Sequence, residues 1–354
     1  MRLPRLIAEG LVALVLLLAT APAHGGDHDA APAAALWQAY KHAFLQQDGR
    51  VIDRQQNGIS HSESQGYGLL LALRYDDRPA FAAMARWTED NLRMRRDGLL
   101  SWSWGKRVTG QWGVIDCNNA TDGDLLVAYA LLRGGERWQA PEYRRMGLAL
   151  VRAIREHLAV THRERTYLLP AYYGFQQEGV LVLNPSYQVF AAYRLFARVD
   201  DRSFWERVHR DSLPLVQATR SGRMKLPADW VALDANGVAP WKERPPLFGY
   251  EAIRVLLYLA WEPQPRFPEG LQELLRLYQR TGRLPASVDL KTGTFSREEA
   301  SAGFYGVYAL AAEKSGNGPL AAQLRARALE KAAAEKDRYY SMSLLLLALC
   351  PPEP

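Results

Sequence analysis

The sequence is poor in the residues that mark several large classes of protein. Its 354 residues include only two cysteines, Cys117 and Cys350, and no CxxC pair. This excludes a disulfide scaffold and a thiol-based metal or redox centre. Lys and Arg number 44 against 38 Asp and Glu, and the densest basic run, residues 93–96, is short. Such scattered charge excludes a nucleic-acid-binding arm. With 48% hydrophobic residues, the composition is that of a folded globular protein.

The first residues also lack a run long enough to cross a membrane comfortably. A basic start at residues 2–5 is followed by an apolar stretch at 11–18 and by the small-x-small triplet Ala21-Pro22-Ala23. This is the layout of a secretory signal peptide, with an uncleaved membrane anchor as the alternative. We therefore expect a signal peptide over residues 1–23, a flexible lead-in over 24–32, and a periplasmic or secreted protein without stable membrane insertion.

From residue 33 onward, apolar residues recur with the period of a helix, and Thr121, Pro79, Pro268 and Pro319 mark helix starts. Pro214 is expected to break or kink the seventh helix. We predict twelve α-helices, at residues 33–46, 62–75, 79–93, 121–133, 140–157, 185–198, 201–219, 248–261, 268–280, 301–314, 319–335 and 337–349.

These helices alternate between two kinds. The even-numbered ones are apolar on nearly every face, as in residues 69–73, 125–132 and 343–348, whereas odd-numbered ones carry charge on one side. A helix that is apolar all round is buried, and one with a charged face meets water. Six buried and six half-exposed helices in alternation predict an all-α protein, an (α/α)6 barrel with six inner and six outer helices. It would form a single domain over residues 33–354.

The inner helices of such a barrel run in one direction, so their first residues meet at one end. The two long connections at residues 94–120 and 220–247 lead into that end and are rich in Trp. Polar, acidic and aromatic residues cluster at the predicted starts of the inner helices, at 62–68, 118–124, 184–187, 249–251, 303–305 and 339–340. We therefore expect the functional site at this mouth.

Acids and aromatic rings at one mouth suit the hydrolysis of sugars. Aromatic rings stack on the flat faces of sugar rings, and glycoside hydrolysis needs one protonated and one ionised carboxyl. Each residue also has a simpler explanation. An acid at a helix start, such as Glu63, Asp122 or Asp124, is usually a capping residue, and loop aromatics often cover a core.

Two motifs at this mouth resemble those of a known family. Ser62-Glu63-Ser64-Gln65-Gly66-Tyr67-Gly68 resembles the S-E-G-Q-G-Y-G motif of glycoside hydrolase family 8, and Ala120-Thr121-Asp122-Gly123-Asp124 resembles its A-[ST]-D-[AG]-D signature. Further similar stretches extend along the whole chain, at residues 49–53, 104–106, 184–187, 229–231, 252–255 and 339–340.

The resemblance implies an (α/α)6 barrel that cleaves internal bonds of β-1,4-glucan with inversion, without a metal or cofactor. Its substrates would be cellulose or cello-oligosaccharides. The similarity extends to periplasmic members encoded with bacterial cellulose synthase, which makes the synthase complex a candidate partner. Two alternatives stay open: a chitosanase or xylanase specificity, and a glucan-binding subunit of an export apparatus with weak or no catalysis.

By motif, Glu63 would be the general acid, and Asp122 would hold the sugar at the scissile bond. The family's base is usually an Asp, where this chain has Glu251. Glu reaches roughly 1–1.5 Å further than Asp, and a misplacement of about 1 Å can cost about a hundredfold in rate. Because some branches of the family take their base from elsewhere, Asp234 and Glu243 in the preceding loop are the fallback bases. Residues expected to bind substrate in the groove are Trp104, Tyr187, Tyr250, Arg254 and Tyr340.

Two smaller expectations follow from the same fold. Ser64, which replaces a Gly of the motif, is expected to crowd the backbone beside the acid. Cys117 precedes an inner helix at the mouth, whereas Cys350 follows the last inner helix at the opposite end. A disulfide requires Cα atoms within about 7 Å, so both cysteines are expected to be unpaired.

Overall fold

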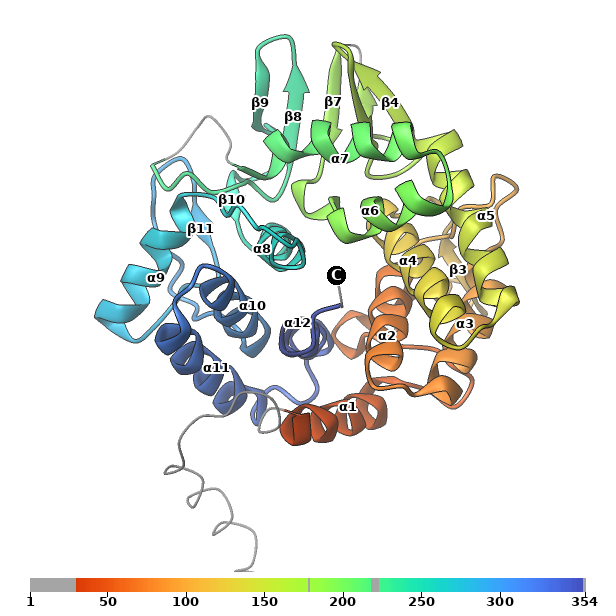
Figure 1. Ribbon diagram of the computed structural model, residues 1–354, viewed down its shortest axis with the longest axis horizontal. Helices are drawn as coiled ribbons and strands as arrows, with labels where there is room; N and C mark the ends of the chain where they lie inside the picture. The colour runs from red at the N-terminus through yellow and green to blue at the C-terminus, as the bar shows by residue number, and fades with distance from the viewer. Residues whose placement is uncertain (1–29, 178, 218–222, 353–354) are drawn as a thin grey trace, which may run out of the picture.

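The computed structural model describes residues 30–177, 179–217 and 223–352, and these ranges contain twelve α-helices in two concentric rings (Figure 1). The (α/α)6 barrel is therefore confirmed. The inner helices are α2 (Ser62–Arg74), α4 (Thr121–Arg137), α6 (Phe190–Val199), α8 (Ile253–Ala260), α10 (Ala302–Lys314) and α12 (Tyr339–Leu349). The outer helices are α1 (Ala30–Phe44), α3 (Arg78–Leu92), α5 (Pro141–Leu158), α7 (Arg202–Gln217), α9 (Gly270–Thr281) and α11 (Gly318–Ala332).

Burial follows the alternation that the sequence predicts. Every residue of α8 is buried, and in α12 only Tyr340 and Leu349 are not. The outer helices bury one face only; in α5 that face includes Leu150, Val151 and Ile154. Helices α1 and α12 contact each other, which closes the ring. The inner ring thus forms a continuous apolar core, and polar residues concentrate at helix ends and on the outer faces.

Several predicted boundaries differ from the observed ones. Helix α1 begins at Ala30, so residues 30–32 belong to its first turn and not to a lead-in. The predicted signal peptide and the rest of the lead-in lie outside the described residues. Helix α7 continues through Pro214, so of the predicted break or kink the break is wrong and the kink stays a prediction. Helix α8 begins only at Ile253, which places Glu251 in the turn before the helix.

The structure also contains short strands, which the helical pattern did not predict. They form the sheets β1-β2-β3, β4-β5, β6-β7-β8-β9 and β10-β11. The pair β7–β8 joins residues about fifty positions apart, Leu181 with Leu233, so no local period reveals it. The strands are β1 (Ser60–His61), β2 (Ser103–Lys106), β3 (Trp112–Asp116), β4 (Ala159–His162), β5 (Arg165–Leu168), β6 (Gln176–Gln177), β7 (Val180–Leu183), β8 (Val231–Asp234), β9 (Gly237–Pro240), β10 (Leu247–Phe248) and β11 (Val288–Asp289).

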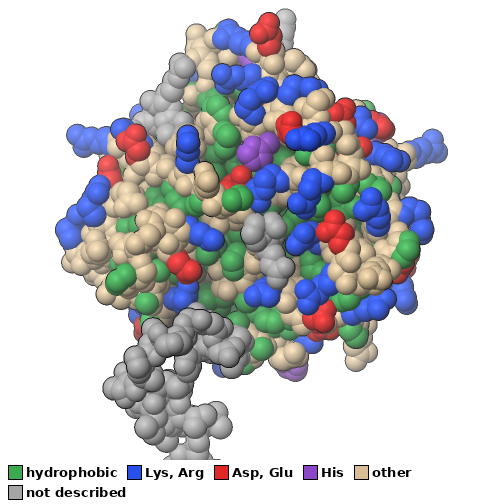
Figure 2. Space-filling model, in the orientation of Figure 1, with side chains coloured by type: hydrophobic (Ala, Val, Ile, Leu, Met, Phe, Trp, Pro, Cys, Tyr) green, Lys and Arg blue, Asp and Glu red, His purple; other side chains and the backbone are tan. Residues whose placement is uncertain are grey.

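The surface carries the modest positive charge of the chain. Figure 2 shows one face of the molecule, on which Lys and Arg are more frequent than Asp and Glu. Within the described ranges, no helix is long and apolar enough to cross a membrane. The acids of the inner-helix starts are the exception to this charge pattern, because they lie in a recess of the barrel.

Both cysteines are free, as predicted. Cys117 is exposed near the mouth, whereas Sγ of Cys350 lies 3.1 Å from the hydroxyl of Tyr75 at the other end. We expect the unfolded protein to take up two alkyl groups in the absence of reductant. Mass spectrometry after iodoacetamide treatment measures this, and a chain that remains unmodified until it is reduced would contradict it.

Candidate active site

The starts of the inner helices surround a central cleft of about 370 Å³. Its walls come from α2, α4 and α12 and from the turns before α6 and α8. The convergence of helix starts at one end is therefore confirmed. The cleft is lined by Asp53, Gln55, Gln56, His61, Ser62, Glu63, Trp102, Ala120, Asp122, Tyr187, Tyr250, Glu251, Arg254, Tyr339 and Tyr340.

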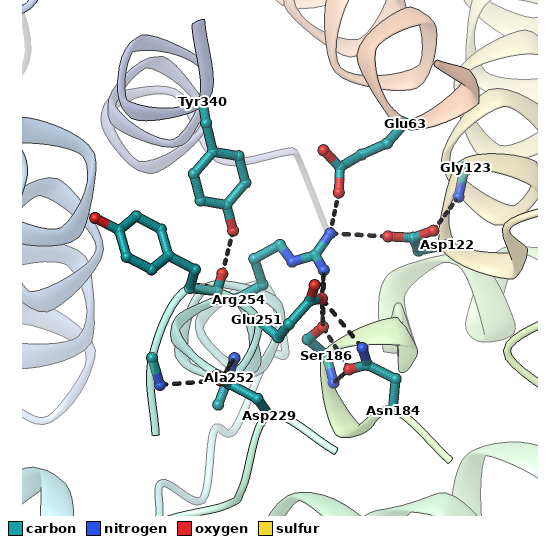
Figure 3. Close-up of polar contacts among 12 residues, drawn as sticks. Glu63, Asp122, Gly123, Asn184, Ser186, Asp229, Glu251, Ala252, Arg254 and Tyr340 are labelled. Carbon is teal, nitrogen blue, oxygen red and sulfur yellow. Dashed lines mark hydrogen bonds and ion pairs between the residues drawn. The ribbon is translucent and has the colours of Figure 1, made fainter. Parts of the chain in front are cut away.

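Arg254 stands at the centre of this cleft and joins three carboxylates (Figure 3). Its Nη1 donates to Glu63 Oε2 and, at 2.8 Å, to Asp122 Oδ2. Its Nη2 donates to Glu251 Oε2. Arg254 is 2% exposed, and its guanidinium lies over the ring of Tyr187, 5.6 Å from its centroid. One buried cation therefore fixes the relative positions of three acids that are far apart in the sequence.

Local hydrogen bonds fix the first turn of α2, which carries Glu63. The N-cap of α2 is His61, whose Nδ1 accepts from Ser64 N at 3.1 Å, while Ser64 Oγ accepts from His61 N at 3.1 Å. This reciprocal capping box engages both the hydroxyl and the backbone N–H of Ser64. Ser64, which was expected to crowd the backbone beside the acid, thus has a role in this structure, because its hydroxyl stabilises the turn.

Two glycines bring Asp122 next to Glu63. A Cβ on Gly123 would lie 2.8 Å from the backbone N of Glu63, and a Cβ on Gly66 would lie 2.6 Å from Leu126 Cβ. Both contacts are closer than packed carbon atoms allow. Glycine at these positions thus lets the starts of α2 and α4 touch, and the two carboxylates reach the same nitrogen of Arg254.

The acids of α4 are not capping residues. The N-cap is Ala120, which makes no side-chain cap. Asp124 instead accepts hydrogen bonds from Leu100 N (3.0 Å) and Asn119 Nδ2 (2.8 Å), and so ties a loop to the helix. Burial raises the pKa of Asp124 to about 7, although these two hydrogen bonds oppose the rise. Neither acid is therefore the N-cap residue, although Asp122 Oδ1 accepts from Gly123 N in the first turn at 2.8 Å, and only Asp122 faces the central cleft.

Burial also raises the pKa of Asp122 well above its ordinary value. The guanidinium of Arg254 lowers this pKa, whereas the negative charges of Glu63 and Glu251 raise it further. Asp122, the most buried of the three acids, therefore keeps its proton to a higher pH than an exposed Asp does.

Glu251 is the most exposed of the three acids, with a side chain that is 34% exposed against 16% for Glu63 and 2% for Asp122. Asn184 Nδ2 donates to Glu251 Oε2 at 3.1 Å, and Ser186 Oγ lies 3.4 Å from the same oxygen. The contacts with Asn184, Ser186 and Arg254 all involve Oε2, so Oε1 is the oxygen available to water.

Asp229 fixes the turn that carries Glu251. Its Oδ1 accepts from Gly249 N at 2.9 Å and from Ala252 N at 2.8 Å, one on each side of Tyr250 and Glu251. Burial raises the pKa of Asp229 to about 6, and the nearby charge of Glu251 adds to the rise. No role for Asp229 could be predicted from the sequence, because its partners are backbone groups some twenty residues away.

The structure sorts the aromatic residues expected in the groove. Tyr187, Tyr250 and Tyr340 line the central cleft, and the hydroxyl of Tyr340 donates to the carbonyl of Tyr250. Trp104 does not line it and packs instead between Trp87 and Trp112. Trp102 occupies the cleft wall in its place.

Trp102 lies in the bend before strand β2, whereas Trp104 lies within that strand, and the two side chains line different recesses. The fallback bases also lie elsewhere. Asp234 ends strand β8 and Glu243 is exposed in the following loop, and neither is among the residues that line the central cleft.

A ring of twelve helices whose mouth holds clustered carboxylates between aromatic rings defines a glycoside hydrolase of the (α/α)6 type. The sequence model of the glycosyl hydrolases family 8 matches residues 10–351. The chain therefore belongs to family 8 of the glycosyl hydrolases, as its motifs indicated.

Relatives and solved structures support this assignment. An endoglucanase of Cellulomonas uda is 36% identical over 258 residues, covering 72% of this chain and 71% of that protein. A probable endoglucanase of Novacetimonas hansenii is 36% identical over 292 residues, covering 80% and 84%. The structure of the endo-β-1,4-glucanase CMCax of Acetobacter xylinum superposes with a TM-score of 0.78 at 33% identity, covering 90% of this chain and 96% of that one.

Proposed function

We propose that the protein is an endo-β-1,4-glucanase that hydrolyses internal bonds of cellulose with inversion. The observation that carries the proposal is the cluster of Glu63, Asp122 and Glu251 around Arg254 in an aromatic-lined cleft. The relatives and solved structures of family 8 described above are named endoglucanases, which supports the same substrate class.

In the proposed reaction, Glu63 protonates the glycosidic oxygen as the bond to the leaving sugar breaks. Glu251, the most exposed acid, takes a proton through Oε1 from the water that attacks the opposite face of the sugar. Asp122 and Arg254 are buried and bonded to each other. In the proposed reaction they bind the sugar whose bond is cut and hold it between Glu63 and Glu251. Tyr187, Tyr250 and Tyr340 provide ring faces for neighbouring sugars.

NMR spectroscopy of the products tests this proposal directly. With cellohexaose as substrate, we expect the first-formed reducing ends to be the α-anomer, because a single displacement inverts the β-linkage. The time course must be followed before mutarotation equilibrates the products. Initial formation of the β-anomer would overturn the inverting mechanism, and absence of products would overturn the activity.

Asp229 is expected to act as a positioning residue for Glu251. Asp229→Ala removes the acceptor for Gly249 N and Ala252 N, so kcat on cellohexaose should fall about 10- to 100-fold. KM should change much less, because the variant leaves the cleft wall intact. Asp229→Asn retains an acceptor oxygen and should restore most of kcat. Equal loss in the Ala and Asn variants would contradict a role that depends on this acceptor.

A second candidate function is a glucan-binding subunit with weak catalysis. The Glu at position 251, where the family usually has Asp, favours it. Isothermal titration with cellohexaose alongside product analysis separates the two functions, because tight binding without products would identify the subunit. Parallel assays with xylan and chitosan test the remaining specificities of the family.

The proposal also covers where the protein is located and which complex it works with. The signal-peptide pattern of residues 1–23 supports a periplasmic or secreted location, and N-terminal sequencing of the mature protein tests it. The cellulose synthase complex remains the candidate partner, because the substrate proposed here is the product of that complex.

A further inference from the structure

A second cleft, of about 840 Å³, lies beside the central one and is called here the outer cleft. Among the described residues, eight large hydrophobic side chains are exposed, and five of them line this cleft. These five are Met94, Trp112, Ile115, Tyr172 and Tyr173. Exposed apolar groups gathered in one recess indicate a binding site, whereas single ones scattered over a surface do not.

Two aromatic walls face this recess. On the β2–β3 hairpin, Trp104 and Trp112 stack with ring centroids 5.4 Å apart, and the guanidinium of Arg50 lies 4.9 Å from the Trp112 ring. On the other side, Tyr172 and Tyr173 meet edge to face at 4.7 Å. Trp112 and Tyr173 nevertheless keep 51% and 60% of their surface exposed, so ring surface remains for a ligand.

Hydrogen bonds to the backbone hold the tyrosine wall in place. Tyr172 N donates to Asn119 Oδ1 at 2.7 Å, and Asn118 Nδ2 donates to Tyr173 O at 3.1 Å. Both asparagines immediately precede helix α4, which carries Asp122. The backbone that carries the two rings is therefore fixed relative to the start of α4, so a ligand would have to order only the side chains.

The outer cleft shares a wall with the central cleft. Trp102 N donates to Asn118 O at 2.8 Å, and this backbone pair separates the two. Trp102 and Ala120 line the central cleft, whereas Ser101 and Cys117 line the outer one. Trp102 and Trp104, two residues apart on one connection, line the central and the outer cleft respectively. A chain held in the outer cleft would thus lie next to the chain being cut.

We propose that the outer cleft is a second β-glucan-binding site, which holds a stretch of polymer outside the central cleft. This inference rests on the proposed glucanase function. The flat faces of glucose expose C–H groups that pack on aromatic rings, and the polar side chains of Asp90, Asn91 and Ser101 in the same recess suit its hydroxyls. A protein partner would be met better by a flat apolar patch than by rings that flank a polar recess.

Affinity electrophoresis in gels containing carboxymethylcellulose tests the site. All proteins carry Glu63→Gln so that the polymer is not cut, and Trp112→Ala with Tyr173→Ala is compared with the parent. We expect retardation by the polymer to weaken about tenfold in this variant, since two stacking surfaces are lost. Val108→Ala, a fully exposed position on the same hairpin that does not line the cleft, is the matched control and should migrate like the parent.

Hydrolysis by the enzyme with Glu63 intact separates this inference from the proposed function. The double variant should hydrolyse cellotetraose, which is too short to fill both clefts, within twofold of wild type, while its KM for carboxymethylcellulose rises. Unchanged retardation of the double variant would overturn the second site. If the wild-type protein releases no products but its retardation still depends on Trp112, the second binding site stands and the proposed glucanase activity is overturned. The single variant Tyr173→Ala, with an expected loss of about threefold, replaces the double variant if circular dichroism shows unfolding.

Discussion

Glu63→Gln is expected to lower kcat on carboxymethylcellulose by about 10²- to 10⁴-fold, the usual contribution of a general acid. Gln has the size of Glu and still offers an oxygen to Arg254, so the cleft should keep its shape. It cannot deliver a proton to the glycosidic oxygen. Release of reducing ends measures the loss, and thermal unfolding checks that the fold is unchanged.

The leaving group gives a sharper form of this test. A dinitrophenyl cellotrioside needs no protonation when its bond breaks, so the defect of Glu63→Gln should shrink strongly on it. Glu269→Gln is the matched control, because Glu269 is an exposed acid paired with Lys225 on the surface. Near-wild-type release of reducing ends by Glu63→Gln would reject the assignment of Glu63 as the acid.

Glu251→Ala is expected to cause a loss of the same order, about 10²- to 10⁴-fold in kcat, because no other group would activate water. Added azide, which needs no base, should restore turnover and give an α-glycosyl azide, the inverted product. The exposed Glu243, a fallback base outside the central cleft, provides the matched control. Full activity of Glu251→Ala, or a comparable loss in Glu243→Ala, would place the base elsewhere.

Glu251→Asp tests whether the longer side chain is adapted to this site. Three groups, on Asn184, Ser186 and Arg254, meet at Oε2 of Glu251. An Asp in the same turn would fall short of them by roughly 1–1.5 Å. We therefore expect Glu251→Asp to be about 10- to 100-fold slower than wild type. A faster Asp variant would show instead that the native site is compromised by its longer arm.

Much of the architecture could be predicted because it rests on local pattern. The order of apolar and charged residues within one helix predicts whether that helix is buried on every side, as the contrast between α12 and α5 shows. The motif residues Glu63 and Asp122 stand at the starts of inner helices, so a barrel with parallel inner helices brings them together without further information.

The strands and the turn before α8 could not be predicted in this way. Strands of two to five residues depend on partners far along the chain, as Leu181 does on Leu233. The apolar run of α8 made residues 248–252 appear helical, but Asp229 accepts from two backbone N–H groups there and holds a turn. Phe248 pairs with Val288 of β11, so the segment enters the helix as a strand.

The lack of cysteine, of basic blocks and of a long apolar span, together with the alternation of helices, predicted a globular (α/α)6 barrel. The resemblance of the motifs at residues 62–68 and 120–124 to family 8 then implied a glycoside hydrolase and roles for Glu63 and Asp122. Only the tertiary structure decided that Arg254 joins all three carboxylates, that Asp229 holds the turn of Glu251, and that Trp104 belongs to the outer cleft. Burial follows a period of a few residues, whereas these contacts depend on glycines that let two helices touch and on groups in distant segments of the chain.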